Sequence, residues 1–272
     1  MKLSVIVLTQ NEEKWLPGCL NSVRPPERWA AEIIVVDDQS TDRTIEIAKK
    51  YGAKVFVHQK KSFATQREFG LRQAQADWVL YLDADERLTK ELAKEIKGIV
   101  GKMPSHLKER LPAVYYIWRK NIFLGREQKP DKVEKLFKRK ALMSWQGVIH
   151  ESPQVKGRKG TLKNHLVHLT HRDIESMTKK TLKWSKIEAE LMMQSGHPPI
   201  TWWRLLRALA RELRCQVLLE QNWRYGLEGW LESIFQVFSR FITYSRLWER
   251  QRSESLEQTY EKIDRSFQQK QV

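Results

Sequence analysis

The stretch WVLYLDADE, residues 78–86, sets the pattern from which the fold can be predicted. Its first five residues are apolar, which is typical of a strand buried on both faces. Three carboxylates then follow within four positions, at Asp83, Asp85 and Glu86, and only Arg87 lies beside them to offset their repulsion. The stretch therefore predicts either an acidic turn that faces solvent or a site for a divalent cation, whose preferred ligands are carboxylate oxygens.

Similar segments surround this one along the first hundred residues. Apolar, β-branched stretches predict further strands at 2–9, 31–38 and 53–59. Helical spacing appears at 11–23, 40–52, 63–75 and 90–100. This alternation predicts an α/β domain with a mostly parallel sheet flanked by helices. Ligands of such sheets bind outside the carboxyl ends of the strands, where two of the predicted strands end in paired acids, so a binding site is favoured over a simple turn.

The pattern changes after residue 100. Residues 113–125 and 134–147 are rich in predicted strand, and 148–173 mix short strands with glycine and basic loops. Helical spacing dominates from Ile174 onward. We therefore expect an α/β domain over 1–172 and a C-terminal helical region over 173–272.

The composition excludes several classes of protein. The chain has 272 residues, of which 41% are hydrophobic, enough for one sizeable core and an appendage. Its two cysteines form no CxxC pattern, so neither a disulfide framework nor a structural zinc site is expected. The apolar run at 3–9 is too short for a signal peptide, and no uncharged stretch has the length of a membrane span. We expect a cytoplasmic protein.

The net charge of +16 is concentrated in one part of the chain. Residues 1–100 carry 16 Lys and Arg against 15 Asp and Glu, whereas residues 101–272 carry 33 against 18. Such an excess attracts polyanions, which include nucleic acid, an anionic membrane surface and a phosphorylated substrate.

Four motifs occur in order along the chain: LSVIVLTQNEE (3–13), EIIVVDDQSTDRT (32–44), WVLYLDADE (78–86) and GVIHE (147–151). Together they resemble family 2 glycosyltransferases with the Rossmann-like GT-A fold, and most of all the bacterial lipopolysaccharide-core β-glucosyltransferases. The resemblance implies inverting transfer of a sugar from a nucleotide-sugar donor, a UDP-hexose, to a hydroxyl of a lipid-linked or lipopolysaccharide-type saccharide. It also implies that residues 1–100 bind the nucleotide and residues 101–172 the acceptor.

The resemblance implies an Mg²⁺ or Mn²⁺ ion that bridges the donor's diphosphate. Asp83 and Asp85 match the family's D-x-D motif, and strand alternation places both on the same side. Asp85 is then expected to contact the metal directly, and Asp83 to contact the ribose or a metal-bound water. His168 is a further candidate for the metal shell, with an ordinary loop or core histidine as the alternative.

Four further residues are expected to bind the nucleotide sugar. By resemblance, Asp38 hydrogen-bonds the base, Thr9 and Asn11 contact the nucleoside, and Arg67 lies near the diphosphate. Asn11 and Asp38 could instead cap the helices that follow them. Arg67 is followed by Glu68 where related enzymes often carry Asn, so an ordinary helix-surface arginine is its alternative.

The GVIHE motif supplies the expected general base. Family 2 enzymes use a carboxylate to take the proton of the attacking hydroxyl, and Glu151 matches it. His150 is the rival, because an imidazole has a more suitable unperturbed pKa. A structural ion pair between Glu151 and a nearby basic residue is the alternative.

The helical region carries an interfacial pattern. A basic stripe is formed by Arg204, Arg207, Arg211 and Arg214, with Trp202, Leu206, Leu209 and Leu213 on the roughly opposite face. Residues 229–248 repeat the aromatic spacing. The pattern predicts either peripheral attachment to the anionic inner face of the plasma membrane or a helical subdomain with a tryptophan-rich core.

Two other functions are compatible with parts of the sequence. A nucleotidyltransferase that acts on sugar phosphates would also bind nucleotides, but residues 7–18 lack the glycine-rich basic loop of that class. A basic nucleic-acid-binding module would explain the charge but not the acids at two strand ends. We expect no nucleic-acid partner, because no recognised motif for one is present.

Overall fold

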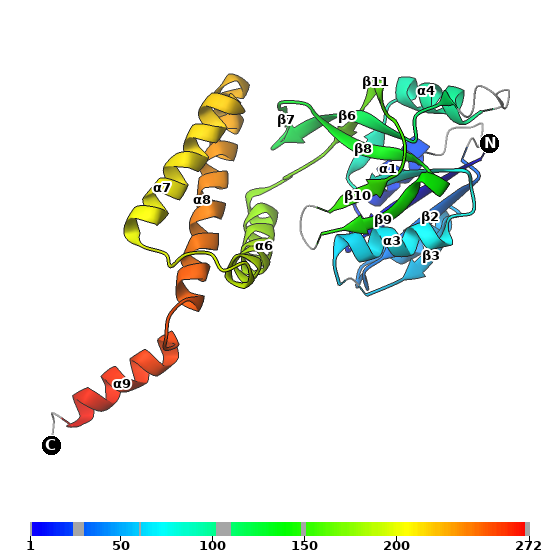
Figure 1. The fold of residues 1–272 in the computed structure, drawn as a ribbon. Helices are drawn as coiled ribbons and strands as arrows, with labels where there is room; N and C mark the ends of the chain where they lie inside the picture. The colour runs from blue at the N-terminus through cyan, green and yellow to red at the C-terminus, as the bar shows by residue number, and fades with distance from the viewer. Residues whose placement is uncertain (1, 24–29, 60, 102–109, 148–150, 270–272) are drawn as a thin grey trace. The chain divides into compact units, whose positions relative to one another are not determined.

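The structure is a computed structural model that describes residues 2–23, 30–59, 61–101, 110–147 and 151–269. The chain forms two compact units, Met1–Thr170 and His171–Val272. The first is an α/β unit and the second is helical (Figure 1).

The α/β unit is built on a nine-stranded sheet with the order β3-β2-β1-β4-β8-β6-β11-β5, in which β7 pairs with β6 at the side of this path. The strands are β1 (Leu3–Thr9), β2 (Glu32–Asp37), β3 (Lys54–Val57), β4 (Trp78–Asp83), β5 (Glu86–Leu88), β6 (Val114–Phe123), β7 (Arg126–Glu127), β8 (Asp131–Lys138) and β11 (Lys159–His168). A separate two-stranded sheet pairs β9 (Leu142–Gln146) with β10 (Ser152–Val155).

The first four strands in space, β3, β2, β1 and β4, are parallel. Thr9 pairs in register with Asp37, and Leu8 pairs with Asp83. The carboxyl ends of β1, β2 and β4 therefore lie next to one another, as the sequence predicts. Beyond β4 the sheet is mixed, because β8 runs antiparallel to β4 and β6, while β11 runs parallel to β6. The predicted parallel character holds only for the first half.

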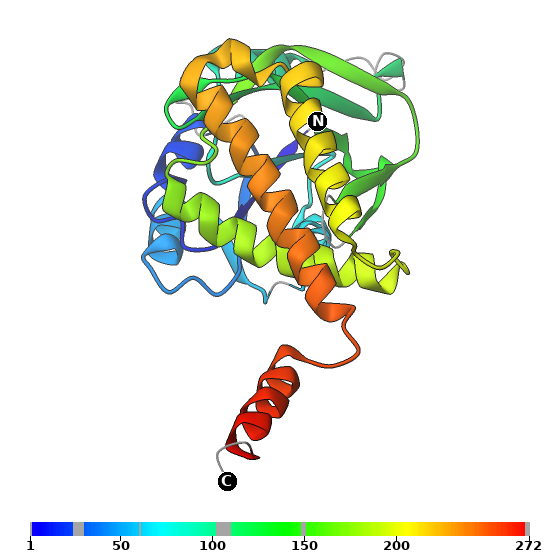
Figure 2. The ribbon, with the colours of Figure 1, turned by 90° about the vertical axis from the view of Figure 1, so that its left-hand side faces the viewer.

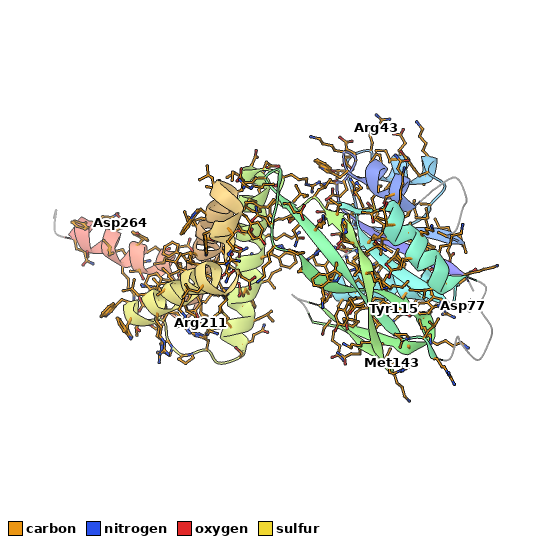
Figure 3. All side chains as sticks on the ribbon, turned by 90° about the horizontal axis from the view of Figure 1, so that it is seen from above. Arg43, Asp77, Tyr115, Met143, Arg211 and Asp264 are labelled. Carbon is orange, nitrogen blue, oxygen red and sulfur yellow. The ribbon has the colours of Figure 1, made fainter. Side chains whose placement is uncertain are left out.

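Helices cover both faces of this sheet (Figure 1). They are α1 (Leu16–Val23), α2 (Thr44–Lys50), α3 (Phe63–Gln73) and α4 (Lys90–Val100). Alternate residues of β1 enter two different buried clusters: one includes α1, α4 and Tyr115 of β6, which Figure 3 labels, and the other includes α3 and Phe137. A Cβ on Gly70 of α3 would lie 2.7 Å from Ile6 Cγ2 of β1, so a glycine allows this helix to approach the sheet closely.

The helical unit consists of α6 (Ile174–Gln194), α7 (Trp202–Arg214), α8 (Gly226–Arg250) and α9 (Leu256–Gln269). Helices α6 and α7 both pack against α8, and Figure 2 shows α7 running alongside α8. Arg240 of α8 forms ion pairs with Glu188 of α6 and Glu212 of α7. Within the described residues, no helix combines the length and apolar character needed to cross a membrane.

Candidate active site

The ends of β1 and β2 are joined through the side chain of Asp37. Thr9 Oγ1 donates a hydrogen bond to Asp37 Oδ1 (2.8 Å), and the N–H and Oγ–H of Ser40 donate to Oδ2 (2.8 Å) and Oδ1 (2.6 Å). Asp37 is fully buried. Its carboxylate therefore holds the loop after β2 against β1 and leaves the next residue, Asp38, at the rim of the sheet.

The loops after β1 and β2 are further linked by Asn11. Its N–H donates to Ser40 Oγ (2.8 Å), and its side-chain oxygen accepts from the N–H of Thr41 (2.8 Å). Asn11 and Gln39 have φ values of 54° and 53°, a left-handed conformation that asparagine tolerates better than most residues. Because α1 begins only at Leu16, the alternative that Asn11 caps this helix is wrong.

Asp38 is almost buried, with 8% of its surface exposed. Its N–H donates to the carbonyl oxygen of Thr9 (2.9 Å), and Gln10 Nε2 donates to its carbonyl oxygen (3.3 Å). Helix α2 begins at Thr44 with Arg43 in the N-cap position, so the alternative that Asp38 caps this helix is also wrong. Asp38 lies beside Thr9 at the rim, where a ligand of a parallel sheet binds.

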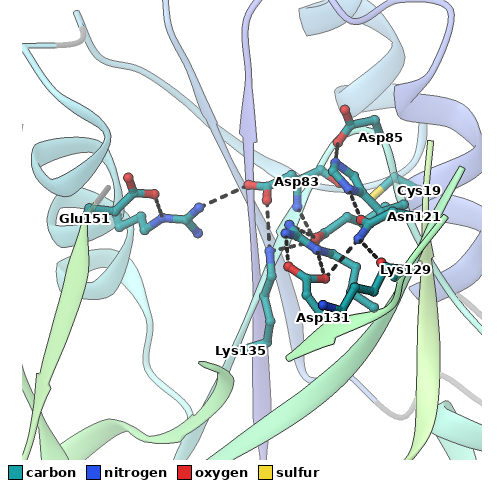
Figure 4. A network of polar contacts seen from close by, with 12 residues as sticks. Cys19, Asp83, Asp85, Asn121, Lys129, Asp131, Lys135 and Glu151 are labelled. Atoms are coloured by element: carbon teal, nitrogen blue, oxygen red, sulfur yellow. Dashed lines mark hydrogen bonds and ion pairs between the residues drawn. The ribbon is translucent and has the colours of Figure 1, made fainter. Parts of the chain in front are cut away.

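Arg67 on α3 joins the end of β4 to the segment that carries Glu151. Figure 4 labels the two carboxylates that it contacts, Asp83 and Glu151. Its Nη2 lies 3.2 Å from Asp83 Oδ1, and its Nε lies 3.0 Å from Glu151 Oε1. The guanidinium also lies over the rings of Tyr81 and Trp145, at 5.6 and 5.1 Å from their centroids. Arg67 is only 7% exposed, so the alternative of an ordinary helix-surface arginine is wrong.

A buried lysine on β8 neutralises one carboxylate at the end of β4 and one at the start of β5. Lys135 Nζ lies 2.8 Å from Asp83 Oδ2 and 2.7 Å from Glu86 Oε2. Burial raises the pKa of Asp83, but Lys135 and Arg67 outweigh it and hold this pKa well below its ordinary value. At Glu86, by contrast, burial prevails over Lys135 and raises the pKa. The two oxygens of Asp83 thus face two cations.

The polar contacts continue from Glu86 to β11. Arg119 Nη1 lies 3.7 Å from Glu86 Oε1, and the same guanidinium binds both oxygens of Asp131 at 2.6 and 3.0 Å. Asn121 Nδ2 donates to Asp131 Oδ1 (3.1 Å), and Asn121 Oδ1 lies 2.8 Å from His168 Nδ1. Since the amide nitrogen of Asn121 is directed to Asp131, its oxygen accepts and His168 Nδ1 carries the proton.

Asp85 and His168 have the chemistry of a metal-binding pair. His168 Nε2 lies 3.7 Å from Asp85 Oδ1. Burial lowers the pKa of His168 to about 4, against the opposing effect of Asp85, so the imidazole is neutral at pH 7. Its Nε2 lone pair therefore faces a carboxylate oxygen, and two electron-pair donors at this distance fit a shared cation. The hydrogen bond from Nδ1 to Asn121 would fix the ring for that role.

Together these contacts form one connected series of side chains, the polar chain. In order, its members are Glu151, Arg67, Asp83, Lys135, Glu86, Arg119, Asp131, Asn121, His168 and Asp85. It holds five carboxylates but three permanent cations. The net charge of the polar chain is therefore negative, which favours binding of a cation at its Asp85 end. Across the described part of the chain, no group of three His, Cys, Asp or Glu side chains could hold a metal by itself. A metal at Asp85 and His168 would complete its shell with ligand oxygens.

The structure brings most of the predicted site residues to one edge of the sheet. Asp83, Arg67 and Glu151 are in direct contact, and Asp85 lies beside His168. The three other predicted residues, Thr9, Asn11 and Asp38, lie at the neighbouring ends of β1 and β2. His150 lies outside the described residues.

Sequence reasoning alone does not identify Lys135, Asn121 and Asp131 as members of this site, and it gives no individual role to Glu86, which is one of the three carboxylates of residues 78–86. The one available signal for Lys135 is its position beside the apolar pair Leu136-Phe137, which predicts a buried strand. Its partners come from β4 and β5, about fifty residues earlier in the chain, and no local pattern encodes that pairing.

Replacing Lys135 with Met should lower the free energy of unfolding by about 3–5 kcal/mol, because it leaves Asp83 and the fully buried Glu86 without their shared cation. Urea denaturation followed by circular dichroism would measure the loss. Lys140→Met changes an exposed lysine next to the same strand and should stay within about 0.5 kcal/mol of the unmodified protein. Equal stability of the two variants would show that Lys135 is not needed to neutralise the site.

Three kinds of comparison relate the chain to known proteins. Residues 4–106 match the family model "Glycosyl transferase family 2". The lipopolysaccharide core biosynthesis glycosyltransferase LpsC of Rhizobium meliloti is 26% identical over 264 residues, which cover 92% of this chain and 93% of LpsC. An uncharacterized glycosyltransferase of Rickettsia conorii is 28% identical, with 91% of this chain and 90% of that protein covered.

Among solved structures, residues 1–349 of TarS from S. aureus in complex with UDP-GlcNAc align with 92% of this chain and 90% of that one, at 19% identity and a TM-score of 0.47. The family match over the strands that end in Thr9, Asp37 and Asp83, and the similarity to glycosyltransferases along nearly the whole chain, lead to one assignment. Residues 4–106 carry a family 2 glycosyltransferase domain, and the chain as a whole is similar to glycosyltransferases, among them one of lipopolysaccharide core biosynthesis.

Proposed function

We propose that this glycosyltransferase moves a hexose from a UDP-sugar, with inversion at the anomeric carbon, to a hydroxyl of a lipid-linked or lipopolysaccharide-type saccharide. The observation that carries the proposal is the polar chain, which connects Glu151 at one end with Asp85 and neutral His168 at the other. One end suits proton abstraction and the other suits a cation. The similarity to LpsC, a protein of lipopolysaccharide core biosynthesis, supports the class of acceptor.

The donor would lie along the ends of β1, β2 and β4. Asp38 would hydrogen-bond the base, and Thr9 and Asn11 would border the nucleoside. Asp83, held by Lys135 and Arg67, would orient the ribose or a metal-bound water. Arg67 would place its positive charge beside the diphosphate.

Asp85 and His168 would hold an Mg²⁺ or Mn²⁺ ion, with Asp83 close to it. When bound, this ion neutralises the diphosphate and assists its departure. The chemistry of the two ligands supports this choice of ion. A carboxylate and a neutral imidazole suit Mn²⁺ and can also bind Mg²⁺. Either ion would take its remaining ligands from phosphate oxygens of the donor.

Glu151 would act as the general base on the acceptor. Its carboxylate takes the proton of the attacking hydroxyl as the new bond to the anomeric carbon forms, and the bond from that carbon to the diphosphate oxygen breaks on the opposite face. Arg67 fixes the carboxylate by its 3.0 Å contact with Oε1. His150 is the second candidate for this role.

The enzyme would work as a peripheral protein on the cytoplasmic face of the plasma membrane, where a soluble donor can meet a lipid-linked acceptor. The exposed aromatic residues of the helical unit support this location.

Thermal unfolding with a panel of nucleotide sugars tests the proposed donor. A UDP-hexose together with Mn²⁺ should raise the midpoint more than either alone, since a ligand at about 100 times its Kd adds about 2.7 kcal/mol of stability. The product then distinguishes the reaction class, because sugar transfer releases a nucleoside diphosphate and nucleotidyl transfer releases pyrophosphate. Salt-sensitive RNA binding without any metal-dependent turnover would contradict the proposal and favour a nucleic-acid-binding module.

A further inference from the structure

Helix α8 leaves a long apolar stripe exposed. Its members recur at helical spacing, and each has between 38% and 69% of its surface exposed: Leu227, Trp230, Ile234, Phe238, Phe241 and Trp248. The opposite face of the same helix is buried against its neighbours through small residues that include Gly229, Ser233 and Thr243. The tryptophans of α8 are therefore not the core of a helical subdomain.

Helix α7, which runs beside α8 (Figure 2), also carries exposed apolar residues. Trp202, Leu206 and Leu213 fall on one face and are 72%, 52% and 44% exposed. Leu219 and Trp223, in the segment that joins the two helices, are 64% and 47% exposed. The pair of helices thus presents far more exposed aromatic and aliphatic side chain than isolated surface residues account for.

The arginines of α7 differ from those of α8 in their partners. On α8, Arg240 pairs with Glu188 and Glu212, and Arg250 pairs with Glu190. No carboxylate of the described residues forms an ion pair with Arg207, Arg211 or Arg214, and all three are exposed. Figure 3 labels Arg211 on α7. This stripe of uncompensated positive charge is complementary to an anionic partner.

We propose that the surface of α7 and α8, defined by these apolar side chains and by Arg207, Arg211 and Arg214, docks on a bilayer that contains anionic lipids. Tryptophan, phenylalanine and leucine would enter the headgroup region. The arginines lie on the roughly opposite side of α7 from Trp202, Leu206 and Leu213, and their long side chains would extend back around the helix to the lipid phosphates. A second copy of the chain fits less well, because a symmetric contact would place two uncompensated arginine stripes close together. The surface would keep the enzyme at the membrane that carries its acceptor.

Sedimentation of the full-length protein with vesicles tests this surface without any donor or turnover, so its outcome is independent of the proposed reaction. The protein should bind vesicles of phosphatidylcholine and phosphatidylglycerol in equal parts much more tightly than vesicles of phosphatidylcholine alone. Reversing the charge of Arg207, Arg211 and Arg214 to Glu should weaken binding by about 100-fold or more, since each arginine near an anionic surface contributes about one factor of five.

The matched control reverses three exposed lysines of the α/β unit, Lys49, Lys50 and Lys94, and so changes the net charge equally. This control should bind almost as the unmodified protein does. A second variant, Ile234→Ser with Phe238→Ser, should also weaken vesicle binding. Its circular dichroism spectrum and its oligomeric state in solution should equal those of the unmodified protein.

Three results would overturn the proposal. They are equal binding to both kinds of vesicle, equal losses in the arginine variant and the lysine control, and conversion of a dimer to a monomer by the Ile234 and Phe238 changes. The last would show that a second copy covers the surface instead.

Discussion

Replacing Glu151 with Gln is expected to slow sugar transfer by about 10²–10⁴-fold, the usual contribution of a general base. The amide has nearly the shape of the carboxylate, and its oxygen can still accept from Arg67 Nε, which lies 3.0 Å from Glu151 Oε1. It cannot take the proton of the attacking hydroxyl. The loss should therefore appear in kcat, while the stabilisation of the protein by donor and Mn²⁺ stays unchanged.

The control for this experiment separates the base from its rival. His150→Gln removes the other candidate in the same motif and should leave most of the transfer rate intact. Rates measured with saturating donor and varied acceptor would compare the two variants directly. A normal transfer rate in the Glu151→Gln variant, or a large loss of transfer rate in the His150→Gln variant instead, would show that Glu151 is not the general base.

Replacing Asp85 with Asn should lower transfer by about 10²–10⁴-fold, which corresponds to the several kcal/mol that a metal contributes to stabilising charge in the transition state. Asp85 Oδ1 lies 3.7 Å from His168 Nε2, so the variant removes the charged member of this pair and keeps its size. The Mn²⁺ concentration needed for half-maximal activity should rise sharply. A chelator should abolish the activity of the unmodified protein.

Asp77→Asn provides the matched control, because it makes the same chemical change in an exposed residue just before β4. Its Mn²⁺ requirement should equal that of the unmodified protein. His168→Gln should also raise the requirement, since it removes the second ligand. If Asp85→Asn kept the original Mn²⁺ dependence, the metal would have to bind elsewhere.

The strands and their carboxyl ends are readily predicted from the sequence. β1, β2 and β4 are mostly apolar, and each ends in a polar residue. In a parallel sheet those ends lie at the same edge, so local patterns predict Thr9, Asp37 and Asp83 at one edge, and the strand order makes them neighbours.

The second half of the sheet is harder to predict, because its pairing joins segments far apart in the chain. β8 inserts between β4 and β6 and runs antiparallel to both. Neither feature leaves a mark in the local sequence, and both Lys135 and Asp131 reach the site through this strand. For this reason the sequence predicts a cation site among the carboxylates of residues 83–86 but does not predict Lys135, which neutralises Asp83 and Glu86.

The two helix-capping alternatives fail for a local reason. Asn11 and Asp38 both precede a helical pattern, yet α1 and α2 begin five and six residues later. The polar side chains of these segments bind backbone N–H groups of the turn after β2 instead. Asn11 Oδ1 accepts a hydrogen bond from the N–H of Thr41, and Asp42 Oδ1 accepts one from the N–H of Thr44. Their positions in the sequence show that Asn11 and Asp38 follow the ends of strands. They do not show which hydrogen bonds these residues form.

The polar chain also limits how the acceptor preference of this enzyme could be redesigned. Each of its charged members contacts the next, so a substitution at one position changes the environment of both neighbours, and effects of paired substitutions will not add. Libraries that vary these positions would mostly yield inactive proteins. Substitutions at exposed positions such as Arg126 and Glu127 of β7, which are not members of the polar chain, leave its contacts intact.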